Sequence, residues 1–133
     1  VEGCINGIGE RAGNVALEQV ILAIEHFGSL AGGNSPFWTR ADRGRLQAVS
    51  DFVRRHMLPR QPHWPITGDN ASKHSSGGHT NAILRNPLAY QPFDPRSIGR
   101  EISIVFGHFL VGIMQRLLSR PAAIGVMITK KLR

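Results

Sequence analysis

The sequence predicts an α/β fold in which one β/α unit opens the chain and mostly helical segments follow. Three observations favour this fold. An apolar run from Val1 to Ile5 reaches a glycine-rich turn with polar side chains. Apolar residues then recur at helical spacing from Leu17 to Phe27. Prolines separate the shorter helical patterns that come later. Barrel strands deliver polar groups to a barrel mouth through turns of this kind.

The first predicted unit comprises residues 1–30. Val1 to Ile5 form its strand, Asn14 can cap the helix, and Gly28 is expected to end it. A lone strand cannot fold without neighbours, so the chain is expected to be a piece of a larger protein.

The second predicted segment comprises residues 31–66. It begins as a loop with glycine and proline punctuation, and a helix is expected from Asp42 to Met57. Prolines at three positions rule out regular structure up to Ile66. The apolar stripe of this helix consists of Leu46, Val49, Val53 and Met57, with Phe52 beside them.

The third predicted segment, residues 67–107, is a helical and extended subdomain. A short helix is expected from Ser76 to Asn86, and the prolines at positions 92 and 95 predict extended backbone from Tyr90 to Pro95. Residues 97–106 mix the helical and the alternating period, and both readings stay open. Residues 108–133 form a divergent basic tail that is expected to pack poorly.

The net charge of +7 is unevenly distributed. All nine acidic residues lie at or before Glu101, whereas the last 26 residues hold five basic and no acidic residues. The basicity therefore belongs to the tail and not to a patterned face, which argues against a nucleic-acid partner. No run of about 20 apolar residues predicts a membrane span. The single cysteine, Cys4, fits a reducing, cytoplasmic location and is expected to be a small buried residue.

The glycine-rich turn groups several polar side chains. Its glycines follow the pattern G-x-G-x-x-x-G, one residue too long for the dinucleotide fingerprint, and we reject that reading. A plain alternative is a surface ion pair with a capping asparagine. The polar residues are Asn6, Glu10, Arg11 and Asn14.

Two histidines and the only tyrosine are further candidates. His74 and His79 lie five residues apart in a polar loop, which is a weak metal-ligand spacing, but either could act as a general base. The phenol of Tyr90 could stabilise a developing oxyanion. The alternative for each is a packed side chain with satisfied polar atoms.

Three blocks resemble the 2-isopropylmalate synthase and homocitrate synthase family of metallolyases. Residues 6–14, N-G-I-G-E-R-A-G-N, match its signature at nine consecutive positions. Residues 76–83 resemble its S-G-x-H-x-[DN]-[AG]-[IV] segment, and residues 90–100 resemble its Y-x-P-[FI]-D-P segment. The blocks occur in family order and cover about residues 1–107.

The resemblance implies a fold and a reaction. The chain would hold the last β/α unit of a TIM (β/α)8 barrel and the helical subdomain after it. The whole enzyme would be an acyltransferase of leucine or related amino-acid biosynthesis that condenses acetyl-CoA with a 2-oxo acid. A divalent metal (Mg²⁺, Mn²⁺ or Zn²⁺) would hold the 2-oxo acid at the barrel mouth. A homodimer is also implied, since residues of the subdomain reach a partner subunit's site in this family.

The resemblance assigns roles to five residues. Asn14 matches a metal ligand, and Glu10 and Arg11 match the substrate pocket. His79 and Tyr90 match groups that act in catalysis together with Glu10. The remaining family ligands, an aspartate and an H-x-H pair, have no match in this chain, so no tight metal binding is expected from it alone.

The tail departs from the family pattern after Gly107, and a shift of reading frame there would explain its composition. The sequence thus predicts part of an acyltransferase, and it leaves the activity of this chain alone open. Two alternatives stand beside this interpretation. One is a catalytically dead remnant that only dimerises. The other is a protein that binds a membrane surface through a basic helix from Phe109 to Arg133.

Overall fold

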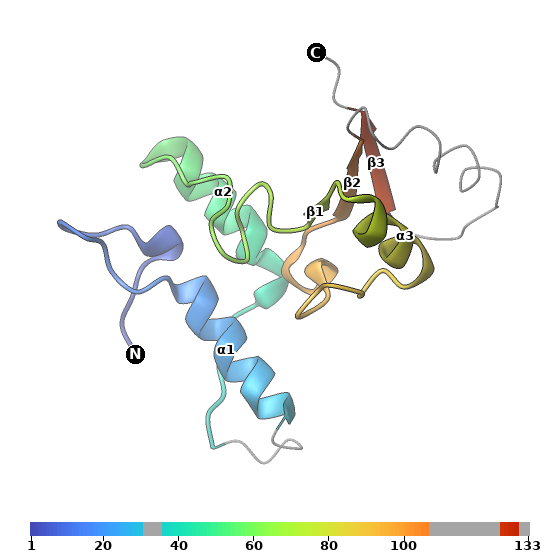
Figure 1. The fold of residues 1–133 in the computed structure, drawn as a ribbon. Coiled ribbons are helices and arrows are strands. Elements are labelled where there is room, and N and C mark those ends of the chain that lie inside the picture. The colour runs from blue at the N-terminus through green and yellow to red at the C-terminus, as the bar shows by residue number, and fades with distance from the viewer. Residues whose placement is uncertain (31–35, 107–125, 131–133) are drawn as a thin grey trace. The chain divides into compact units, whose positions relative to one another are not determined.

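A computed structural model describes residues 1–30, 36–106 and 126–130. The chain divides into two compact units, Val1–Ala71 and Ser72–Arg133, and each is described by itself (Figure 1). The described part is rich in helices and holds one small parallel sheet. None of its helices has the length and apolar character needed to cross a membrane.

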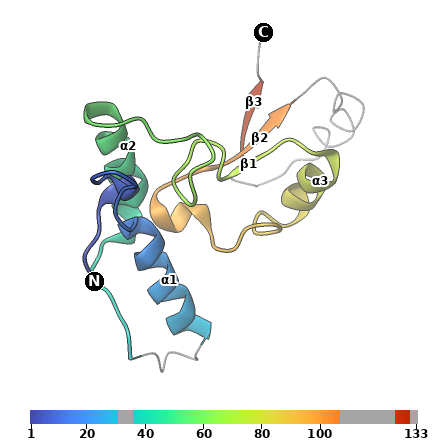
Figure 2. The same ribbon diagram turned by 60° about the vertical axis from the view of Figure 1, so that its left-hand side comes forward.

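The first unit contains two α-helices and two 3-10 turns. They are η1 (Ile5–Gly7), α1 (Leu17–Leu30), η2 (Arg43–Arg45) and α2 (Leu46–His56). The turn η1 contacts both helices, and it lies beside α2 and the start of α1 (Figure 2). Residues 57–72 are turns and irregular backbone, as the three prolines predict.

The predicted strand from Val1 to Ile5 is wrong. Only Cys4 makes a bridge, a parallel one with Ala16, and Ile5 already begins η1. The Cys4 N–H donates to the carbonyl of Val15 at 3.0 Å, and the Leu17 N–H donates to the Cys4 carbonyl at 3.1 Å. A strand needs a neighbour along its length, and in the described residues this segment finds one for a single position.

The predicted helices lie where expected, but their ends differ. Helix α1 begins at Leu17 and continues past Gly28 to Leu30. Asn14 is not its N-cap residue, because the helix begins at Leu17 and Asn14 lies two residues before the cap position. The Asn14 side-chain nitrogen donates instead to Cys4 Sγ and to the Ile8 carbonyl, both at 3.3 Å.

The buried face of α2 coincides only in part with its predicted apolar stripe, because Leu46 is buried and Val53 half-buried but the polar Ser50 is buried beside them. The buried residues are Leu46 and Ser50, whereas Val49, Phe52 and Met57 are 40%, 56% and 65% exposed. Before it, Asp42 caps η2 by accepting a hydrogen bond from the Gly44 N–H at 3.2 Å. The inward face includes the polar Ser50 because the element it meets, η1, buries the polar Asn6.

The second unit is built on a three-stranded parallel sheet of order β1-β2-β3. Its elements are β1 (Lys73–His74), α3 (Gly77–Arg85), η3 (Pro95–Ile98), β2 (Ile102–Phe106) and β3 (Val126–Lys130). Lys73 pairs with Ser103, and Ile102 pairs with Val126. The fully buried Ile83, Ile102 and Ile104 form its core, in which α3 covers the sheet, as parallel connections require.

One prediction in this unit needs correction, and one open alternative is decided. Tyr90 is not extended but has a left-handed backbone (φ 60°) in the turn after α3, because the prolines at positions 92 and 95 restrict their own predecessors and not Tyr90. The mixed pattern of residues 97–106 reflects two elements, the end of η3 and the strand β2.

The predicted basic tail, residues 108–133, contributes one described element. Residues 126–130 form β3 and pair with β2 along its whole length, so this segment has regular backbone structure, and its poor packing stays a prediction. The rest of that tail, including most of the segment from Phe109 to Arg133, lies outside the described residues.

Candidate functional site

The glycine-rich turn is a closed loop that follows η1. The Asn14 N–H donates to the Gly7 carbonyl at 3.0 Å, and the Gly13 N–H donates to the Glu10 carbonyl at 2.9 Å. A glycine is required at position 13, because its φ is 88° and an added Cβ would lie 2.5 Å from the Gly7 oxygen. Arg11 at the tip also has a positive φ, 52°. The tight loop therefore leaves Glu10 and Arg11 exposed, whereas the Asn14 carboxamide turns back onto Cys4 and Ile8.

Glu10, Arg11 and Asn14 are exposed on this loop. In the described residues, no ion pair joins Glu10 to Arg11, so the surface-pair interpretation finds no support there. The loop thus brings the three predicted site residues of the first unit onto one exposed turn. Asn6, by contrast, does not lie on this exposed loop, because it is buried against α1 and α2.

Asn6 is surrounded by polar partners that the sequence does not reveal. Its backbone N–H donates to the Glu18 carboxylate, at 3.2 Å to Oε1 and 3.1 Å to Oε2. Its side-chain nitrogen donates to the Ser50 carbonyl at 2.9 Å. The fully buried Glu18 also accepts a hydrogen bond from Trp64 Nε1 at 2.8 Å.

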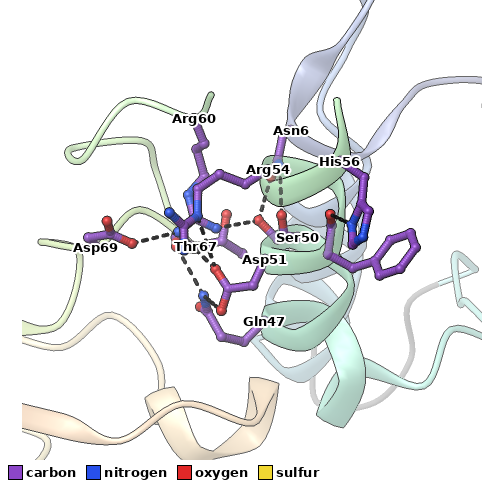
Figure 3. Close-up of polar contacts among 10 residues, drawn as sticks. Asn6, Gln47, Ser50, Asp51, Arg54, His56, Arg60, Thr67 and Asp69 are labelled. Carbon is purple, nitrogen blue, oxygen red and sulfur yellow. Dashed lines mark hydrogen bonds and ion pairs between the residues drawn. The ribbon is translucent and has the colours of Figure 1, made fainter. Parts of the chain in front are cut away.

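Arg60 joins this network from the proline-rich segment (Figure 3). Its guanidinium donates to Ser50 Oγ at 2.5 Å and to Asp69 Oδ1 at 2.7 Å, and it lies 3.1 Å from Asp51 Oδ1. The Arg60 side chain has no exposed surface, so the two carboxylates compensate a charge that would otherwise be costly to bury.

In the second unit the structure brings His79 and Tyr90 together. Their rings stack with centroids 3.9 Å apart and 12° between the planes. His79 lies on α3 and Tyr90 follows that helix, and both side chains are exposed. Stacking leaves the imidazole nitrogens and the phenol oxygen at the ring edges, where a ligand can meet them.

His74 completes this aromatic group from β1. Its ring centroid is 5.9 Å from that of His79, and its Nε2 lies 2.6 Å from Nε2 of Gln91. Burial, and then the neighbouring His79, lower the pKa of His74 below its usual value. His74 is therefore neutral at physiological pH, so it accepts or donates hydrogen bonds without adding charge.

Each group is thus assembled within its own unit, in part from residues far apart in the sequence. The sequence misses Glu18, Ser50 and Arg60. Glu18 interrupts the apolar pattern of α1, which is a weak signal. For Ser50 and Arg60 no sequence signal exists, because their partners are 44 and 9 residues away along the chain.

Within the part of the chain that the structure describes, the residues do not form a metal site by themselves. Asn14 offers one carbonyl oxygen, whereas a hard divalent cation takes about six oxygen ligands. In residues 1–30, 36–106 and 126–130, no three histidine, cysteine, aspartate or glutamate side chains gather as a metal-binding group. We therefore derive no chemical step through a metal from these residues.

Two family models match the sequence. The model described as HMGL-like matches residues 1–53, and the model described as homocitrate synthase post-HMGL domain-like matches residues 66–131. The boundary between them falls close to the division between the two compact units. The second match continues past Gly107, so the expected end of the family pattern at that residue finds no support.

Individual relatives are about 40% identical. A protein named as an (R)-citramalate synthase, CimA, of Archaeoglobus fulgidus is 41% identical over 108 residues. The chloroplastic methylthioalkylmalate synthase 3 of Arabidopsis thaliana is 43% identical over 101 residues, and 2-isopropylmalate synthase 2 of Caldanaerobacter subterraneus is 38% identical over 104. These matches cover 79%, 74% and 77% of this chain but only 20%, 20% and 25% of the relatives. The chain therefore spans a fifth to a quarter of their length.

Proposed function

The chain belongs to the HMGL-like family of 2-isopropylmalate, homocitrate and citramalate synthases, and from this premise we propose that it is part of an acyltransferase. The longer protein would condense acetyl-CoA with a 2-oxo acid and would act as a homodimer. Residues 1–30 would supply the last β/α unit of its barrel, and the second unit would supply the subdomain after it. The activity belongs to the longer protein, since this chain spans a fifth to a quarter of its relatives.

The stacked pair of His79 and Tyr90 is the observation that carries the proposal. The methyl group of a thioester is a weak carbon acid, so the reaction needs a positioned base and a donor to the thioester oxygen. A neutral imidazole can take the proton, and a phenol can donate a hydrogen bond as negative charge develops. The 3.9 Å stacking distance lets both groups serve one small substrate.

The loop of the first unit would bind the second substrate. The Arg11 guanidinium suits the carboxylate of a 2-oxo acid, because its fork of donors matches two carboxylate oxygens. Glu10 would line the same pocket and act with the catalytic pair. Asn14 would contribute one ligand to a divalent metal whose other ligands lie elsewhere in the longer protein.

A remnant that only associates with a second copy is the alternative. The observation that favours it is the exposed apolar side of α2, with Val49, Phe52 and Met57 at its surface. A monomeric chain in sedimentation experiments, together with activity in the assay below, would decide against this alternative.

The test is a graft in which residues 1–106 replace the matching segment of the 2-isopropylmalate synthase 2 of Caldanaerobacter subterraneus. Release of free CoA thiol is followed with acetyl-CoA and a panel of 2-oxo acids. His79→Ala and Tyr90→Phe should each lower kcat by roughly a hundredfold or more, while KM for the 2-oxo acid changes little.

The matched control is His63→Ala, which removes an exposed histidine of the first unit and should leave kcat unchanged. If the His79 and Tyr90 variants turn over like the parent graft, the stacked pair is only packing and the proposed roles are wrong.

A further inference from the structure

The conformation of Asn6 requires support from its surroundings. Its φ of 58° places it in the left-handed region, although it carries a side chain, and it is buried. Non-glycine residues persist in this region where surrounding contacts over-determine them. The signature block 6–14 thus begins at a residue whose backbone geometry depends on other parts of the fold.

Ser50 satisfies both ends of the Asn6 carboxamide. The Asn6 side-chain nitrogen donates to the Ser50 carbonyl at 2.9 Å, and the Ser50 hydroxyl donates to Asn6 Oδ1. Ser50 is fully buried on α2, so water cannot replace either partner. The carboxamide is therefore held in one orientation by one residue that is distant in sequence.

Arg60 holds the Ser50 hydroxyl in turn. Its Nη1 donates to Ser50 Oγ at 2.5 Å, which directs the hydroxyl hydrogen toward Asn6. Asp69 and Asp51 fix the other guanidinium nitrogen at 2.7 Å and 3.1 Å (Figure 3). A buried network of directed hydrogen bonds and ion pairs favours one geometry, whereas apolar packing tolerates several.

The backbone conformation of Asn6 affects the loop directly, because Asn6 is joined to the first residue of the loop. Gly7 follows directly, and its carbonyl accepts the hydrogen bond of the Asn14 N–H at 3.0 Å. We propose that Ser50 and Arg60 are positioning residues that act through Asn6 to hold the loop in the form that presents Glu10, Arg11 and Asn14. The contacts come from the structure, and the role of the presented side chains rests on the proposed function.

The first test uses the full chain and limited trypsin digestion. Arg11 is exposed at the tip of the loop, so cleavage between Arg11 and Ala12 reports how often the loop opens. Cleavage after Arg85, in the second unit, is the internal standard. Ser50→Ala and Arg60→Met should speed cleavage after Arg11 about tenfold relative to Arg85, as expected when buried hydrogen bonds are lost.

Two further variants separate positioning from general stability. Ser50→Thr keeps the hydroxyl and should restore a rate close to that of the parent. Arg55→Met removes an exposed arginine of the same helix and should change nothing. Equal acceleration after Arg11 and Arg85 would mean general unfolding and would overturn the proposal, as would an unchanged rate in Ser50→Ala.

The second test uses the grafted synthase. Ser50→Ala should raise KM for the 2-oxo acid about tenfold with a smaller change in kcat, and Ser50→Thr should recover it. Faster opening of the loop without any change in KM would overturn the functional role of Ser50. If the parent graft is inactive, the proposed function fails, and the trypsin comparison alone decides whether Ser50 and Arg60 hold the loop.

Discussion

The buried carboxylate of Glu18 offers the sharpest test of how the first unit is held together. It has no exposed surface and accepts hydrogen bonds from the Asn6 N–H and from Trp64 Nε1. One side chain of α1 thus fixes both the start of the signature block and the proline-rich segment. Removal of its charge or of its acceptors should loosen both at once.

The expected magnitudes follow from these contacts. Glu18→Gln keeps one acceptor oxygen but replaces charge-assisted hydrogen bonds by neutral ones and turns an NH₂ group toward a donor. The loss is about 2 kcal/mol of the free energy of unfolding. Glu18→Ala leaves two buried donors without an acceptor and creates a cavity, which costs about 4 kcal/mol.

Urea unfolding followed by tryptophan fluorescence measures this loss in the first unit. The chain has two tryptophans, and a Trp38→Phe background leaves Trp64 as the reporter beside Glu18. The control is Glu25→Gln on the same helix, which removes a partly exposed ion pair with Arg43 and should cost under about 1 kcal/mol. Equal midpoints for Glu18→Gln and Glu25→Gln would refute the reasoning.

Three further results are expected. The free energy of unfolding of the second unit should fall as pH drops from about 6.5 toward the lowered pKa of His74, because the unfolded chain binds more protons in this range. Urea titrations at several pH values should show a weaker dependence of this free energy on pH in His74→Gln. In thermal unfolding, Gly13→Ala should lower the free energy of unfolding by roughly 1–3 kcal/mol. Gly78→Ala should raise it slightly, because Gly78 has open space around it. Calorimetry of this chain with Mg²⁺, Mn²⁺ or Zn²⁺ should show no micromolar binding, and such binding lost in Asn14→Ala would contradict this.

The helices could be predicted because their signals are local. The apolar spacing of α1, the cap at Asp42 and the short pattern after Ser76 each act within one or two turns. The strand predicted from Val1 to Ile5 failed because strand formation depends on a partner, and sequence pattern alone does not supply one. The same limit applies to β2 and β3, which are defined by their mutual pairing.

The candidate site could likewise be predicted only in part from the sequence. The residue types and spacing of the blocks identify Glu10, Arg11, Asn14, His79 and Tyr90 as candidates. The sequence could not show that His79 and Tyr90 stack, because Tyr90 reaches His79 only through a left-handed turn after α3. Nor could it show that His74 joins them from β1.

The sequence by itself determined the family, the positions of the three helices and the residues of the signature loop, since each depends on the identity and order of nearby residues. Only the tertiary structure decided which face of α2 is buried. There Ser50 is buried beside Leu46, while Val49 and Phe52 of the apolar pattern stay exposed, because Ser50 and Arg60 satisfy hydrogen bonds around Asn6 that water cannot reach. Such a network joins residues far apart in the chain, and it exists only after the chain has folded.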